Sequence, residues 1–149
     1  MIDFGLNCKM SDIEASLLIP QLNKIDELWK KKESVALRYE DAFTKAGIKF
    51  PVTREKAKNA RHLFPVWVDK RYRDQIVTEL TENGIGCTIN YLPVHLTTYY
   101  RKKFGFTENM FPVAETIGTQ TISIPLYPKL SDDEVNYIIS KTIELSLKA

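Results

Sequence analysis

An aromatic and polar run, which follows a predicted strand, holds the side chains of this chain that are best suited to binding. Residues 90–100 read Asn-Tyr-Leu-Pro-Val-His-Leu-Thr-Thr-Tyr-Tyr, with three tyrosines and one histidine around a proline. Loops that follow strands are held by a rigid scaffold and stay open to solvent, so binding residues concentrate there. Tyrosine and histidine combine an apolar body with a polar tip, which suits a pocket wall. From residue type alone, a small aromatic core under the loop is the favoured alternative.

The second candidate is the N-terminal run Gly-Leu-Asn-Cys-Lys-Met at residues 5–10. Asn7 and Lys9 stand just before a predicted helix start, where free backbone N–H groups attract anions. The amide of Asn7 could donate to a phosphate oxygen, with Lys9 adding positive charge. A simple turn at a loose terminus is the alternative, and the residues alone favour it.

Other chemistry has little support in the sequence. There is no glycine-rich phosphate loop, no G-x-G-x-x-G fingerprint, no H-E-x-x-H and no C-x-x-C pair. Cys8, His62, Cys87 and His95 are scattered without the local spacing of a zinc site, so no metal is expected. Cys87 is interpreted as a small buried hydrophobe within a strand. A free-standing enzyme that uses Cys8 or His95 is the least favoured function.

A long helix at residues 11–46 is the first element that must position these candidates. Ser11 with Glu14 three residues later is a capping-box pattern. Pro20 has no N–H to donate, so we expect it to interrupt or kink the helix and leave a helix pair. The second helix, residues 22–46, would span roughly 35–40 Å, which indicates that one end reaches another domain or subunit. Its predicted apolar face consists of Leu22, Ile25, Trp29, Ala36, Tyr39 and Phe43.

The rest of the chain alternates between strand and helix patterns. Pro65 cannot donate to a strand ladder, which predicts an edge or a bulge in its strand. Ser131 and Glu134 form a second capping box. The order favours an α/β or α+β class, with a long N-terminal helix pair followed by a small sheet and helices packed on it. The predicted strands are residues 48–51, 62–68, 86–90 and 121–124, and the predicted helices are residues 71–83, a short one within 91–106, one that begins near 111, and one from 131 onward.

Composition limits the classes of function. The chain has 149 residues and a formal net charge of +2, with charges of both signs interspersed, which gives no electrostatic footprint for nucleic acid. No run of about 18 apolar residues predicts a membrane span, and the first residues do not form a signal peptide. Two distant cysteines are typical of a reducing cytoplasm rather than a disulfide scaffold. One domain is the expected organisation.

Several motifs then occur in one order along nearly the whole chain. Residues 5–15 match a G-x-N-x-R-M stretch that leads into a helix with S-D-[IL]-x-A, and residues 90–95 match H-Y-x-P-x-H. Residues 111–115 match F-P-x-A-E, and residues 123–130 match S-L-P-L-Y-P-x-L. On these motifs the chain resembles the C-terminal portion of the DegT/DnrJ/StrS family, pyridoxal-phosphate-dependent aminotransferases that act on nucleotide-linked keto-sugars. Lys9 replaces the usual arginine, and Asn90 replaces the first histidine of the loop.

The resemblance implies a homodimer of the aspartate-aminotransferase-like fold. Residues 1–149 would be the C-terminal small domain, with residues 1–21 as the tail of the cofactor-domain segment and residues 22–46 as the long connecting helix. The family's N-terminal domain holds the Schiff-base lysine and an aspartate that pairs with the pyridinium nitrogen, and neither motif occurs here. Pyridoxal 5'-phosphate is therefore expected in the full-length enzyme and not on this chain alone.

The same resemblance implies site residues and partners. Asn7, with Lys9 nearby, would reach the cofactor phosphate of the other subunit, and Tyr91 and His95 would border the sugar-nucleotide pocket. No catalytic residue is expected in this chain. The expected function is that of a C-terminal aminotransferase fragment, inactive alone, whose partners are the missing N-terminal domain, a second copy and a nucleotide-sugar substrate. The alternative is a non-catalytic interaction or dimerisation module derived from that family.

Overall fold

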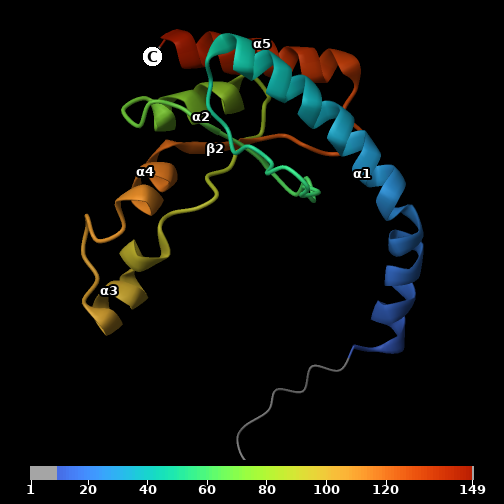
Figure 1. Ribbon diagram of the computed structural model, residues 1–149, viewed down its shortest axis with the longest axis horizontal. Helices are drawn as coiled ribbons and strands as arrows, with labels where there is room; N and C mark the ends of the chain where they lie inside the picture. The colour runs from blue at the N-terminus through green and yellow to red at the C-terminus, as the bar shows by residue number, and fades with distance from the viewer. Residues whose placement is uncertain (1–9, 149) are drawn as a thin grey trace, which may run out of the picture.

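The structure, a computed structural model, describes residues 10–148. Figure 1 shows α1 and α5 lying over α2 and a small sheet, while the first half of α1 and the segment with α3 and α4 lead away from this core on opposite sides. The elements in chain order are α1 (Asp12–Ala46), β1 (Phe64–Trp67), α2 (Arg73–Glu82), a 3-10 turn (Val94–Leu96), α3 (Thr98–Phe104), α4 (Pro112–Gln120), β2 (Thr121–Ile124) and α5 (Asp132–Lys148).

The expected helix pair at the N-terminus is wrong, because α1 is one continuous helix with Pro20 inside it. Proline removes one helical hydrogen bond, to the carbonyl of Ser16 four residues earlier. That stretch of α1 is exposed, so water can bond to the carbonyl that loses its partner, and the helix continues. The predicted capping box is confirmed, since the Glu14 N–H donates to Ser11 Oγ over 3.3 Å and the Ser11 N–H donates to the Glu14 carboxylate over 2.9 Å.

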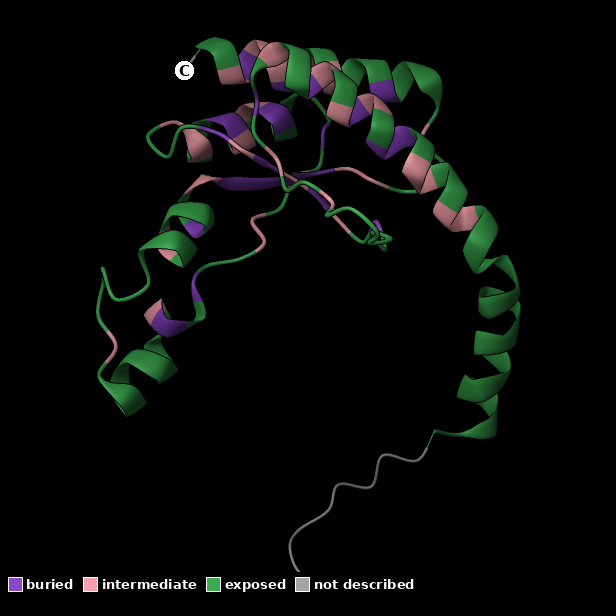
Figure 2. Cartoon of the chain, in the orientation of Figure 1, coloured by how far each residue is buried: buried purple, intermediate pink, exposed green. Residues whose placement is uncertain are grey.

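The core forms where the second half of α1 meets the sheet. Tyr39 and Phe43 of α1 are fully buried, and Phe64 of β1 lies with its ring centre 5.0 Å from that of Tyr39 and 6.0 Å from that of Phe43. The Tyr39 hydroxyl donates to the carbonyl of Pro125 over 3.0 Å. The predicted apolar face of α1 is thus buried only in its second half. Figure 2 shows the first half of the helix exposed, and Leu22 and Ile25 are among its exposed residues.

Two antiparallel strands form the sheet, and they explain how Pro65 is tolerated. Pro65 lies opposite Ser123, whose own N–H and carbonyl bond to the backbone of Thr88 on the far side of β2. Pro65 therefore occupies a pair that exchanges no backbone hydrogen bonds, and its missing N–H costs nothing there. The predicted strands at residues 48–51 and 86–90 are wrong as strands, because each is reduced to a single bridge, Lys49 to Trp67 and Thr88 to Ser123.

Helices α2 and α5 close the core as expected. Ile76 and Leu80 of α2 are buried, and Val135 and Ile138 of α5 are buried against them and the sheet. The second predicted capping box is confirmed, with the Ser131 N–H donating to the Glu134 carboxylate over 2.7 Å. No helix within residues 10–148 combines the length and the apolar character that crossing a bilayer requires.

Candidate functional site

The loop of residues 90–97 runs from the edge of the sheet to α3. The Thr88 bridge to β2 anchors its start, and the Thr88 hydroxyl donates to Asn90 Oδ1 over 2.7 Å. The peptide bond between Asn90 and Tyr91 is cis. The Tyr91 side chain is 69% exposed, so its ring and hydroxyl are open to a ligand.

Helix α4 supports this loop through a glycine. The helix has no side chain at Gly118, and the Pro93 ring lies where one would be. A Cβ atom added at Gly118 would be 2.6 Å from Pro93 Cδ, 2.8 Å from Pro93 Cγ and 3.1 Å from the Tyr91 carbonyl oxygen. The loop can pack directly on α4 only because this residue is glycine.

His95 points into the protein rather than into solvent. Its side chain is buried, and Nε2 lies 3.0 Å from Glu115 Oε1 on α4. The imidazole ring also packs edge-on against Phe111, with 4.8 Å between ring centres, and against Phe106 at 6.4 Å. The loop thus combines both interpretations of the sequence, since Tyr91 is exposed while His95 belongs to a small aromatic core beneath the loop.

Glu115 connects the loop to the chain before α4. Its carboxylate accepts the Asn109 N–H over 2.9 Å and the Phe111 N–H over 3.2 Å in addition to its contact with His95. These backbone hydrogen bonds, chiefly the one from Asn109, hold the pKa of the Glu115 carboxyl below its ordinary value. Residue-by-residue reasoning missed Glu115 and Gly118. The F-P-x-A-E motif was the signal for Glu115, and nothing local indicates Gly118.

The lowered pKa of Glu115 predicts a pH dependence of stability. A carboxyl whose pKa falls on folding stabilises the fold above its ordinary pKa of 4.5, and this contribution is lost as the pH drops through the lowered value. We therefore expect Glu115→Gln to lower the free energy of unfolding at pH 7, and the difference from the wild type to shrink steadily below pH 4.5. Denaturant titrations of both proteins from pH 7 to pH 3 measure this difference in unfolding free energy.

Glu108→Gln is the matched control, because Glu108 is an exposed carboxylate close to the same helix. Its unfolding free energy should track the wild type at every pH. If the difference in unfolding free energy between Glu115→Gln and the wild type stays constant down to pH 3, the pH dependence does not come from the Glu115 carboxyl.

The remaining sequence candidates fall into two groups. Asn7, Lys9 and Cys8 lie outside the described residues. Cys87 is half-buried, and burial raises the pKa of its thiol to about 11, which makes it a poor nucleophile at neutral pH. Within residues 10–148 no three histidine, cysteine or carboxylate side chains gather as a metal site would require.

The lysines bear on cofactor binding. Across residues 10–148 none of them is buried. A lysine that forms an imine with a carbonyl cofactor works from an enclosed pocket that lowers its pKa. Among the described residues every lysine is thus at least partly open to solvent, and Tyr91 exposes its ring and hydroxyl.

Comparison with known proteins relates this sequence and fold to a protein family. The sequence model of the DegT/DnrJ/EryC1/StrS aminotransferase family matches residues 1–143. The chain belongs to this family. The expectation that it is a mixed α/β portion of a pyridoxal-phosphate aminotransferase fold is confirmed by its superposition on a sugar aminotransferase that has been solved in apo and pyridoxal-phosphate forms.

The proteins that this chain matches are covered over only part of their own length. The spore coat polysaccharide biosynthesis protein SpsC of Bacillus subtilis is 36% identical over 91% of this chain and 36% of its own. The UDP-4-amino-4-deoxy-L-arabinose–oxoglutarate aminotransferase of Shewanella sediminis is 29% identical over 97% of this chain and 40% of its own. The putative sugar aminotransferase Spr1654 of Streptococcus pneumoniae superposes with a TM-score of 0.90 and 32% identity, covering 99% of this chain and 38% of that chain.

Proposed function

We propose that this chain is the C-terminal portion of a pyridoxal-phosphate-dependent aminotransferase that transfers an amino group to a nucleotide-linked keto-sugar. Biosynthesis of a cell-surface polysaccharide or of an antibiotic sugar is the proposed context. Coverage is the observation that carries the proposal, since 99% of this chain superposes on Spr1654 while only 38% of Spr1654 is matched. The proposed location is the cytoplasm.

The proposed roles of the site residues follow the resemblance and the local chemistry. The exposed Tyr91 would contact the sugar nucleotide, and His95 would border the same pocket from the buried side of the loop. Asn7 would donate its amide N–H to the cofactor phosphate of the other subunit of a homodimer, with Lys9 adding positive charge. A charge-assisted hydrogen bond of this kind is stronger than one between neutral groups.

We place most of the cofactor contacts on the N-terminal domain that the resemblance implies, which would lie in the part of the longer relatives that this chain does not match. Pyridoxal phosphate supplies an electron sink for amino-group transfer once it is bound through a lysine amine. The proposal places that lysine on the N-terminal domain, so the chain alone would not transaminate. Its own residues would orient the sugar nucleotide and close the cofactor phosphate site.

A complementation experiment tests this proposal. The isolated chain is mixed with pyridoxal phosphate, dialysed and treated with borohydride, and we expect no stoichiometric reduced lysine adduct. The chain is then co-expressed with the N-terminal part of SpsC that it does not match, the relative with 36% identity. With L-glutamate supplied as the amino donor, the assembled pair should retain the cofactor and aminate a UDP-linked keto-sugar while glutamate is converted to 2-oxoglutarate.

Two variants test whether Tyr91 and His95 act on the sugar-nucleotide substrate rather than on cofactor binding. Tyr91→Phe and His95→Ala in the assembled pair should impair turnover while cofactor retention is unchanged. If the isolated chain instead keeps one reduced lysine adduct per molecule, the proposal that the cofactor-binding lysine lies on the N-terminal part is overturned. An assembled pair that holds the cofactor but leaves nucleotide-linked keto-sugars unchanged would overturn the activity.

A non-catalytic interaction module is the second candidate function, and one observation favours it. The first half of α1 exposes a series of large apolar side chains, and exposed apolar surface of this extent marks association sites. Size-exclusion chromatography at high concentration distinguishes it, since a clean monomer would count against a module that associates. The exposed apolar residues of this half are Ile13, Leu17, Leu18, Ile19, Leu22 and Ile25.

A further inference from the structure

Residues 51–61, called the strap below, lie between the Lys49 bridge and β1 and contact α1 where that helix leaves the core. Val35 is the first buried residue of α1, and the described residues before it are exposed or half-buried. Among residues 10–148, every hydrogen bond or ion pair that joins residues 10–34 to another segment ends on residues 58–61 of the strap. The strap is thus the polar connection between the first half of α1 and the rest of the fold.

Arg61 is the centre of this connection. Its side chain is only 5% exposed, although it is charged. Nη1 lies 2.7 Å from Glu40 Oε1, Nη2 lies 3.1 Å from Glu33 Oε1, and Nε also donates to Glu33. Glu33 and Glu40 are seven residues apart and so share one face of α1. One guanidinium therefore ties the strap to two turns of the helix, on either side of the point where burial begins.

The strap is braced internally and continues along α1. Asn59 Oδ1 accepts the backbone N–H of Arg61 over 2.8 Å, and Asn59 Nδ2 donates to Thr53 Oγ1 over 3.2 Å. The Trp29 indole N–H donates to the carbonyl of Asn59 over 2.7 Å, and the Lys58 ammonium lies 4.1 Å from the Trp29 ring centre. The Trp29 contacts lie one turn beyond Glu33 toward the exposed end of the helix, and the Lys58 ammonium, 3.8 Å from Asp26 Oδ1, reaches two turns beyond it.

We propose that the strap sets the direction in which the first half of α1 leaves the core, and that Arg61 is the residue on which this depends. Where packing on one side of a helix ends, only the backbone hydrogen bonds of the helix itself still oppose bending. The contacts of Arg61 with Glu33 on one side and Glu40 on the other span that point. Without the guanidinium, Glu33 and Glu40 would lie on one face of α1 as two neighbouring carboxylates without the cation that Arg61 places between them. This inference does not depend on the proposed function.

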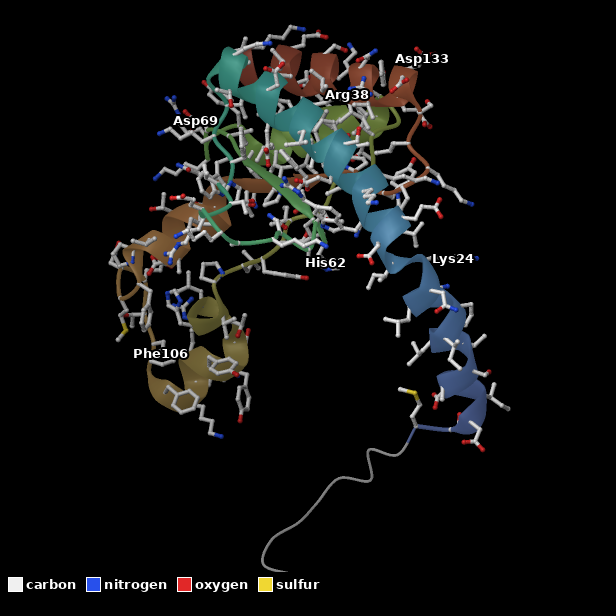
Figure 3. The ribbon with its side chains drawn as sticks, turned by 45° about the vertical axis from the view of Figure 1, so that its right-hand side comes forward. Lys24, Arg38, His62, Asp69, Phe106 and Asp133 are labelled. Atoms are coloured by element: carbon white, nitrogen blue, oxygen red, sulfur yellow. The ribbon has the colours of Figure 1, made fainter. Side chains whose placement is uncertain are left out.

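Distance measurements between two spin labels test the proposal on the whole chain. Figure 3 shows Lys24 on the exposed half of α1 and Arg38 where the helix lies beside α5. Labels are placed at Lys24→Cys and at Ser140→Cys on α5, in a background with Cys8→Ser and Cys87→Ala. We expect one narrow distance distribution for the parent chain and at least a twofold wider one for Arg61→Ala.

Arg54→Ala is the matched control, because Arg54 is an arginine of the same strap but is exposed. Its distribution should stay as narrow as that of the parent, and a widening equal to that of Arg61→Ala would overturn the assignment to Arg61. Trp29→Phe keeps an aromatic ring and removes the N–H donor, so it should widen the distribution less than Arg61→Ala.

Circular dichroism identifies the variants that fold. If Arg61→Ala does not fold, Trp29→Phe and Asn59→Ala decide the question, since neither removes a buried charge. If Arg61→Ala, Trp29→Phe and Asn59→Ala fold and all keep narrow distance distributions, the proposal is overturned. The stiffness of α1 alone would then set the direction in which its first half leaves the core.

Discussion

Replacing Phe43 with alanine is expected to lower the free energy of unfolding by about 3–5 kcal/mol, the usual cost of removing a buried phenylalanine side chain. Phe43 is fully buried on α1 and lies with its ring centre 5.7 Å from that of Tyr39 and 6.0 Å from that of Phe64. The truncation would remove one of the two aromatic contacts, those of Tyr39 and Phe43, that join the long helix to Phe64 of β1. Urea denaturation followed by circular dichroism measures the change.

Leu37→Ala is the matched control for this prediction. Leu37 lies on the same helix but is 52% exposed, so its truncation should change the unfolding free energy by no more than about 0.5 kcal/mol. Because the whole domain is stabilised by only about 5–15 kcal/mol, Phe43→Leu provides a milder variant that should cost less than half as much. Equal effects of Phe43→Ala and Leu37→Ala would contradict the location of the core.

Gly118→Ala should destabilise the chain by a net of up to about 2 kcal/mol, the reverse of what this substitution usually does within a helix. Alanine is favoured over glycine there by about 1 kcal/mol, but the added Cβ would lie 2.6 Å from the Pro93 ring. Overpacking of this kind costs about 1–3 kcal/mol or more, and a proline ring cannot rotate away. The substitution should therefore push the loop of residues 90–97 off α4.

Hydrogen exchange at Leu96 and Thr97 reports on the loop directly, because their N–H groups bond to Pro93 and Val94 within it. Both should exchange faster in Gly118→Ala. Gly86→Ala is the control, since a Cβ atom at Gly86 meets nothing within 4 Å and the residue is also glycine. A Gly118→Ala protein that is more stable than the wild type would show that the loop does not rest on α4.

The long helix shows how far periodicity alone could predict this fold. The apolar spacing and the capping box identified α1 and its start, and the buried face at Ala36, Tyr39 and Phe43 agrees with the structure. The same spacing continues through Leu22 and Ile25, which are exposed. A repeat of apolar residues tells which side chains share a face, but it does not tell where the partner surface ends.

The candidate loop shows the corresponding limit for a site. Residue type and position after a strand pointed to Tyr91 and His95, and the structure exposes Tyr91 and buries His95. Their different surroundings depend on Glu115 and Gly118, which lie more than twenty residues later than Tyr91 in the chain. Local sequence patterns carry no information on such distant contacts, just as they do not reveal that Arg61 would be buried between two glutamates of α1.

The placement of Pro65 has a consequence for how the chain behaves at high concentration. Strands with free outward N–H groups can recruit a strand of another molecule and start a growing sheet. On β1 the outward-facing residues are Pro65, which has no N–H, and Trp67, whose N–H already donates to the carbonyl of Lys49 over 2.8 Å. An incoming strand would find no donor along this side of β1. This edge of the small sheet is therefore protected against edge-to-edge polymerisation by one proline and one bridge.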